Sequence, residues 1–257
     1  MSTITQNLTR IQQAKADIKT AIEAKGVTVP SSATIDTYDD YVSQISGGSC
    51  DDSVLINLIE RDIESIDIPS GTTTIGAYAF YYCSSLTNIT IPSGVTSIGN
   101  YAFYRCGSLT SIDIPSGVTS IGSQAFQYCS SLSSCTIGSG VISIGGNAFT
   151  YCSNLTSIDI PDSVTSIGNG VFGYCYSLTS CTIGSGVTSI GSNAFNSCTS
   201  LISITVEATT PPTLSNVNAF NNTNNCPIYV PSASVTTYQT TDNWTSLSSR
   251  IQAMPNS

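Results

Sequence analysis

One spacing governs most of this 257-residue chain: the same residue types return every 23 positions, from about residue 65 to residue 220. Each unit carries an isoleucine-glycine pair, a phenylalanine, a cysteine three residues later and then a leucine. The phenylalanines are Phe80, Phe103, Phe126, Phe149, Phe172 and Phe195, and an imperfect further copy centres on Phe220. A fixed period of this length indicates a solenoid, in which each unit buries its apolar face only against its neighbours.

The first half of a unit has the pattern of a short strand. Polar and apolar residues alternate over Ser111–Ile114, which predicts a strand with Ile112 and Ile114 facing inward. The Pro-Ser-Gly sequence at 115–117 then predicts a turn. Gly122 is expected where the backbone adopts a conformation, or makes a close approach, that a Cβ atom would forbid.

The second half has a different periodicity. Between Ala125 and Leu132 the apolar residues are separated by one, three and three positions, which fits one side of a short helical or 3₁₀ turn. Stacked units would place equivalent residues about 4.8 Å apart along a parallel β-ladder. The sequence therefore predicts an α/β solenoid of short 23-residue repeats over residues 65–230.

The cysteines follow the repeat. Cys135 and Cys181 stand where Ile112 stands in another unit, so the repeat cysteines are expected to act as small buried apolar residues. Cysteines stacked about 4.8 Å apart exceed the usual Cβ separation of about 3.8 Å in a disulfide, so reduced thiols are expected. The alternative is a disulfide at the less regular Cys50 or Cys226. No C-x-x-C pair is present, and neither a metal site nor a cofactor is expected.

These motifs resemble those of a known repeat family. Leu109-x-x-Ile112-x-Ile114 matches the L-x-x-L-x-L core of leucine-rich repeats, with Pro-Ser-Gly in place of the asparagine that normally follows. The A-F-x-x-C-x-S-L half resembles the short BspA-like class of bacterial leucine-rich repeats. The resemblance covers roughly residues 65–230 and implies a scaffold for binding, without identifying a ligand.

Residues 1–48 differ in kind from the repeats. Apolar residues at alternating spacings of four and three predict a short heptad seam, in which Lys15 is the one polar position. The seam consists of Ile4, Leu8, Ile11, Ile18 and Ile22. We expect this helical segment to anchor the protein or to join copies of it, as a trimer if the helices are parallel. The alternative is a helical hairpin that packs on itself or on the first repeat, with residues 49–64 as a connector in either case.

The N-terminal segment also resembles the opening segment of phage tail and fibre proteins, over about 45 residues. The residues that carry this resemblance are Ala21, Ile22, Gly26, Val27, Val29, Pro30 and Tyr38. It implies a virion protein whose N-terminal helices contact other virion proteins. No secretory signal or lipobox is visible, so direct export is not expected, and a virion protein would reach the exterior by cell lysis.

Beyond residue 230 the repeat pattern ends. Four apolar residues then fall at helical spacing: Trp244, Leu247, Ile251 and Met254. We expect an amphipathic helical cap over residues 231–257, because the end of the solenoid would otherwise offer an unpaired edge.

Two exterior columns are candidate binding surfaces. The outward strand position alternates between Asp and Thr, and its acidic members are Asp67, Asp113 and Asp159. Their separation of about 10 Å limits repulsion and is too wide for two carboxylates to share one calcium ion. The position before each repeat cysteine holds Tyr82, Arg105, Tyr128, Tyr151 and Tyr174. Tyrosine combines an apolar ring with a polar tip, which suits contact with carbohydrate or protein; alternatively, these rings cover the core of the neighbouring repeat.

The charge and composition of the chain argue against several classes of function. The chain has 7 Lys+Arg, 16 Asp+Glu and no histidine, which gives a net charge of −9. This acidic balance argues against nucleic acid as a partner, and no apolar run is long enough to span a bilayer. The missing histidine removes the commonest general base, and no catalytic motif stands apart from the repeat.

The sequence therefore favours a non-enzymatic phage virion protein of the tail, fibre or capsid surface. Its solenoid would bind a glycan or protein of the host surface, or neighbouring virion proteins. Two alternatives remain: a bacterial BspA-like cell-surface adhesin with an unusual export route, and a purely structural virion component.

Overall fold

The computed structural model describes residues 64–255. The predicted N-terminal helical segment, its seam from Ile4 to Ile22, Cys50 and nearly all of the connector lie outside the described residues.

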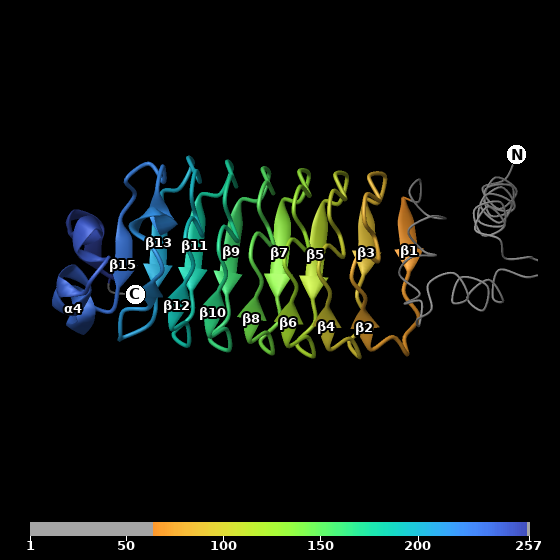
Figure 1. The fold of residues 1–257 in the computed structure, drawn as a ribbon, viewed down its shortest axis with the longest axis horizontal. Coiled ribbons are helices and arrows are strands. Elements are labelled where there is room, and N and C mark those ends of the chain that lie inside the picture. Colours follow the sequence, from red (N-terminus) through yellow and green to blue (C-terminus); the bar gives the residue numbers. More distant parts are fainter. Residues whose placement is uncertain (1–63, 256–257) are drawn as a thin grey trace, which may run out of the picture.

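Each repeat contributes one longer and one shorter strand, and the stacked repeats form an elongated solenoid (Figure 1). The longer strands are β1 (Ser65–Asp67), β3 (Asn88–Thr90), β5 (Ser111–Ile114), β7 (Ser134–Ile137), β9 (Ser157–Ile160), β11 (Ser180–Ile183), β13 (Ser203–Val206) and β15 (Ile228–Val230). The shorter strands are β2 (Thr74–Ile75), β4 (Ser97–Ile98), β6 (Ser120–Ile121), β8 (Ser143–Ile144), β10 (Ser166–Ile167), β12 (Ser189–Ile190) and β14 (Thr213–Leu214).

The strands pair in parallel and in the register of the repeat. The shorter strands form one seven-stranded ladder from β2 to β14, whereas the longer strands form three sheets, β1-β3, β5-β7 and β9-β11-β13-β15, the last of which is extended by β16 (Ile251–Ala253). Ile98 pairs with Ile121, and Ile112 pairs with Cys135, so a cysteine does take the place of the strand isoleucine. The predicted solenoid with a parallel β-ladder is confirmed.

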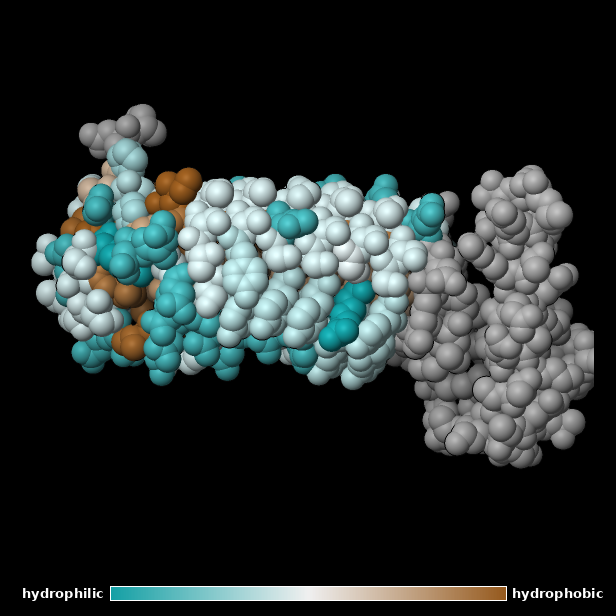
Figure 2. Space-filling view, turned by 90° about the horizontal axis from the view of Figure 1, so that it is seen from above, coloured by the Kyte–Doolittle hydropathy of each residue, from teal (hydrophilic) through white to brown (hydrophobic). Residues whose placement is uncertain are grey.

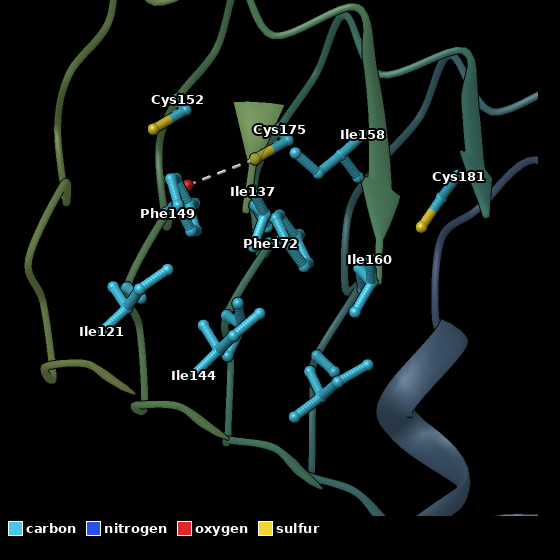
Figure 3. Close-up of a cluster of buried hydrophobic side chains, with 14 of the residues drawn as sticks. Ile121, Ile137, Ile144, Phe149, Cys152, Ile158, Ile160, Phe172, Cys175 and Cys181 are labelled. Carbon is cyan, nitrogen blue, oxygen red and sulfur yellow. Dashed lines mark hydrogen bonds between the residues drawn. The ribbon is translucent and has the colours of Figure 1, made fainter. Parts of the chain in front are cut away.

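A single apolar core runs the length of the solenoid. The repeat phenylalanines stack face to face, with ring centroids 4.9 Å apart for Phe80 and Phe103 and 5.5 Å apart for Phe195 and Phe220. Isoleucines and cysteines surround this column (Figure 3). Each unit therefore buries its apolar residues against the units before and after it.

The cysteines of this core are free thiols in the described part of the chain. The Cys175 Sγ–H donates to the carbonyl oxygen of Phe149 in the preceding repeat at 3.3 Å (Figure 3). Cys106, Cys129, Cys152 and Cys198 make the equivalent bond. The thiol thus supplies a hydrogen-bond donor as well as apolar volume.

Threonine side chains add hydrogen bonds between neighbouring repeats. The Thr96 N–H and its hydroxyl both donate to the carbonyl oxygen of Thr73, at 2.8 and 3.0 Å. In the next repeat, the N–H and the hydroxyl of Thr119 donate in the same way to the carbonyl oxygen of Thr96, at 2.8 and 3.1 Å. A second column, which includes Thr87, Thr110 and Thr179, repeats the arrangement. These side chains join neighbouring repeats without any charged group.

The predicted helical turn is wrong in the regular repeats. Tyr101 and Arg105 have φ values of 59° and 60°, in the left-handed region, so this segment is a series of turns. The Phe103 N–H then donates to Ala125 of the next repeat at 2.7 Å, whereas a helix would use that donor internally. Among the repeats within residues 64–255, only the imperfect last copy forms a 3₁₀-helix, η2 (Val217–Phe220).

The C-terminal end is covered by short helices: η3 (Ser232–Ser234), α4 (Val235–Thr240) and η4 (Thr245–Arg250). Trp244 is fully buried there, as expected of an anchor, and its indole N–H donates to the carbonyl oxygen of Pro212 at 2.7 Å. The expected helical face does not continue through Ile251. Instead β16 (Ile251–Ala253) pairs in parallel with β15, because Ile251 returns to the repeat register opposite Ile228.

No helix within residues 64–255 is both long and apolar enough to cross a membrane.

Candidate ligand-binding face

The backbone of the turn segment determines where its side chains lie. The five predicted residues Tyr82, Arg105, Tyr128, Tyr151 and Tyr174 all have φ values between 60° and 63°. The Tyr128 N–H donates to the carbonyl oxygen of Thr150 in the next repeat at 2.9 Å, while the neighbouring Phe126 and Cys129 are buried. The left-handed residue therefore places its side chain on the exterior, and successive repeats align these side chains.

These five side chains form one continuous stack, which we call the tyrosine ridge. The rings of Tyr128 and Tyr151 lie 4.7 Å apart at 6°, and those of Tyr151 and Tyr174 lie 4.6 Å apart at 4°. The Arg105 guanidinium lies 5.1 Å from the centroid of the Tyr82 ring and 4.9 Å from that of Tyr128. Arg105 thus fills the one gap in the aromatic column through cation–π contacts.

Two further aromatic columns flank the first part of the ridge, and sequence reasoning missed them. Tyr78 stacks on Tyr101 at 4.9 Å, and Tyr81 stacks on Tyr104 at 5.1 Å. Tyrosine returning after 23 residues at both positions was the available signal. On the face shown in Figure 2, side chains of near-neutral hydropathy form rows that cross several repeats.

The ridge is neutral except at Arg105. Partial burial, and then the neighbouring Tyr174 and Tyr128, raise the pKa of Tyr151, so its hydroxyl stays protonated at physiological pH. A hydrogen bond with Tyr104 raises the pKa of Arg105, whose guanidinium is in any case charged at physiological pH. Tyr82 is 37% exposed. This surface can therefore offer aromatic rings, hydroxyl groups and one cation to a ligand.

The aspartate column lies elsewhere in the repeat. Asp113 and Asp159 are exposed on β5 and β9, and their strand partners are Thr136 and Thr182. Asp67 belongs to β1, opposite Thr90. No three His, Cys, Asp or Glu side chains within residues 64–255 gather as a metal site would require. The structure thus brings the ridge residues together and keeps Asp113 and Asp159 on a separate strand surface.

Comparison with solved structures identifies the same architecture in other proteins. A leucine-rich repeat protein of T. pallidum is 26% identical, with a TM-score of 0.55, and the match covers 75% of this chain and 87% of that one. The pneumococcal vaccine antigen PcpA is 19% identical, with a TM-score of 0.52, and the match covers 74% of this chain and 54% of that one. The second likeness shows the fold alone. No curated protein matches the sequence.

The family comparison covers the repeats, from residue 59 to residue 242. The model of the BspA type leucine-rich repeat region, which contains 6 copies, matches residues 59–179 and 121–242. The resemblance of residues 1–48 to phage tail and fibre proteins lies outside these matches and stays a prediction. Over more than half of its length, the chain belongs to the BspA-type leucine-rich repeat family.

Proposed function

We propose that this protein is a non-enzymatic attachment protein and that the tyrosine ridge is its ligand-binding surface. The BspA-type family generally consists of non-enzymatic binding scaffolds. The observation that carries the proposal is the continuous stack of Tyr128, Tyr151 and Tyr174 on the exterior.

The scaffold itself does not require tyrosine in this column. Ser197 occupies the equivalent position of a later repeat with φ 62°, and the core phenylalanines are fully buried with or without a ring outside them. A left-handed conformation costs a non-glycine residue about 1 kcal/mol or more, and tyrosine has no special tolerance for it. A stack of rings kept at such positions is better explained by a ligand than by folding.

The ligand we propose is a glycan or protein of a host surface. Tyrosine rings present apolar faces and edges together with hydroxyl groups, a combination that suits sugar C–H faces and mixed protein surfaces. Arg105 adds a single donor cluster to an otherwise neutral face.

We propose that the protein is located in a virion. The support for this location is the resemblance of residues 1–48 to phage tail and fibre proteins, and those helices would contact other virion proteins. BspA-like proteins are often cell-surface proteins, which favours the adhesin alternative. A labelled antibody against this chain, imaged on purified particles and on bacterial cells, would separate a virion protein from a cell-surface adhesin.

The binding proposal is tested with a triple variant, Tyr128→Ser, Tyr151→Ser and Tyr174→Ser. Serine is chosen because Ser197 already occupies this column. The wild-type protein should bind cells or members of a broad glycan array, and the triple variant should lose that binding while keeping its circular dichroism spectrum. Equal binding by a folded triple variant would overturn the proposal.

A further inference from the structure

The two columns beside the ridge change character along the solenoid. The column that starts with Tyr78 and Tyr101 continues as Gln124, Asn147, Gly170 and Asn193. The column that starts with Tyr81 and Tyr104 continues as Gln127, Thr150, Gly173 and Asn196. Both columns thus lose their side chain in the same repeat, at Gly170 and Gly173.

This double loss leaves a depression of about 280 Å³, which we call the glycine slot. Its lining includes Gly170, Gly173, Asn147, Asn193 and Tyr174 of the ridge, and the Asn147 side chain reaches over Gly170, where its Oδ1 atom would meet an added Cβ atom. Asn147 and Asn193 belong to repeats that are two apart, about 9.6 Å between backbones, and the Asn147 amide takes up part of this gap. The remaining depression of about 280 Å³ has room for one ring of a ligand.

At Gly173 an added Cβ atom would lie 3.3 Å from the carbonyl oxygen of Gly170, so a side chain there requires the neighbouring backbone to yield by a few tenths of an ångström. At Gly170 the backbone conformation does not demand glycine. Gly170 has φ 64°, but Asn147 and Asn193 adopt φ 58° and 59° in the same column with full side chains. Gly170 is held in place by the Thr150 hydroxyl, which donates to its carbonyl oxygen. The missing side chains therefore leave a depression that the Asn147 amide fills only in part.

The lining is polar and uncharged. Asn193 and Asn196 have no side-chain hydrogen-bond partner among residues 64–255, so each amide offers a donor and an acceptor to a ligand. The ring of Tyr174 supplies an aromatic border. Arg105, the cation of the ridge, lies three repeats before Tyr174, so an anionic group in the slot would find no countercharge.

We infer that the glycine slot holds one neutral pyranose ring of a bound glycan. The hydroxyl groups of the ring would bond to the asparagine amides, and its apolar C–H groups would contact Tyr174. The inference rests on the proposed attachment function, for which it names the class of ligand and the position of one sugar unit.

The test uses the full chain, with maltotriose, mannotriose and chitotriose as probes in saturation-transfer NMR and calorimetry. At least one of these neutral trisaccharides should bind to the wild type at concentrations up to about 10 mM, the weak end for a single small site. Gly173→Gln fills the slot with the residue that Gln127 already places in this column, and it should weaken binding more than about tenfold. Asn193→Ala combined with Asn196→Ala should weaken binding to a similar extent.

Gly71→Gln is the matched control, because a Cβ atom at Gly71 meets nothing within 4 Å. It should bind as the wild type does, and thermal unfolding should verify that all variants fold. The inference is overturned if no trisaccharide binds to the wild type, or if a folded Gly173→Gln protein binds as tightly as the Gly71→Gln control.

A second comparison separates the slot from the ridge. The pair Tyr128→Ser and Tyr151→Ser alters the ridge and leaves the slot lining intact. If this pair abolishes cell or array binding while Gly173→Gln does not change it, the attachment function stands and the slot inference fails. If Gly173→Gln abolishes trisaccharide binding while the pair leaves cell binding unchanged, the slot stands and the ridge proposal fails.

Discussion

At the scale of single residues, close contact between repeats explains why some glycines recur. A Cβ atom added to Gly122 would lie 2.5 Å from the Asn100 nitrogen and from the Gly99 carbonyl carbon of the preceding repeat. Gly122 is not in the left-handed region, so close approach is the reason for this glycine. The sequence expectation for Gly122 is thereby confirmed.

Gly122→Ala should lower the free energy of unfolding by about 2 kcal/mol, because backbone on both sides must move to admit the methyl group. Gly71→Ala, at an open position, should change stability by less than about 0.5 kcal/mol. Urea unfolding of both variants measures the difference. Equal stabilities would contradict the close stacking of repeats.

At the scale of elements, the C-terminal end of the phenylalanine column differs from its middle. Each interior ring stacks between two equivalent rings, whereas the last one, Phe220, meets Trp244 at 5.8 Å. Trp244 in turn packs edge to face against Tyr238 of α4 at 4.9 Å. The cap thus closes the aromatic core with one side chain.

Trp244→Ala should cost about 3–5 kcal/mol, since it opens a cavity at a fully buried site and leaves the Pro212 carbonyl without its donor. Trp244→Phe retains a ring and should cost about 1–3 kcal/mol, mainly for the lost hydrogen bond. Thermal and denaturant unfolding provide the comparison. A loss below about 1 kcal/mol for Trp244→Ala would mean that Trp244 does not anchor the cap.

Much of this architecture follows from local sequence, and the exceptions share a physical cause. The alternation of polar and apolar residues predicted that Ile112 and Ile114 face inward. The equivalence between repeats predicted that Cys135 lies in a strand. The turn segment was mistaken for a helix because apolar spacings of three and four suit both, and the deciding hydrogen bonds run between repeats. The strand at Ile251 was missed for the same reason, since its partner Ile228 lies in the previous turn. The glycine slot escaped notice because it depends on side chains that are missing from two columns together.

At the scale of the whole molecule, the buried thiols make stability depend on pH. Burial raises the pKa of Cys152, Cys175 and Cys181 in the core, and the same direction holds for Cys106, Cys129, Cys135, Cys198 and Cys226. An unfolded thiol loses its proton near pH 8.5, whereas these folded thiols retain theirs. The stabilisation is therefore complete below pH 8.5 and is lost as the pH rises above it.

We expect the unfolding free energy, measured under reducing conditions, to be flat from about pH 7 to 8 and to fall steeply above about pH 9. Each retained proton contributes up to about 1.4 kcal/mol per pH unit. Cys181→Ile, which restores the residue found at Ile158 and Ile204 on either side, should make the fall less steep by one such contribution. A profile that stays flat to pH 9.5 would contradict protonated core thiols.

We propose that the N-terminal segment, residues 1–48, joins copies of the chain and so sets its oligomeric state. Analytical ultracentrifugation of the full chain should give a species of three times 26.8 kDa. Ile11→Asp with Ile18→Asp introduces charge into the heptad seam and should yield monomers with unchanged strand content. A wild-type protein that sediments as a monomer would contradict the proposed association.

The most direct test of the account compares the two candidate faces on one ligand. Calorimetry would measure the dissociation constant of the best glycan or protein ligand for the wild type, for the ridge variant with Tyr128, Tyr151 and Tyr174 changed to serine, and for Asp113→Thr with Asp159→Thr. Threonine is the natural partner residue of that strand column, at Thr136 and Thr182, so the aspartate variant should fold normally. We predict that the ridge variant weakens binding by more than about a hundredfold and that the aspartate variant binds as the wild type does. Loss of binding in the aspartate variant, with wild-type affinity in the ridge variant, would contradict the assignment of ligand binding to the tyrosine ridge.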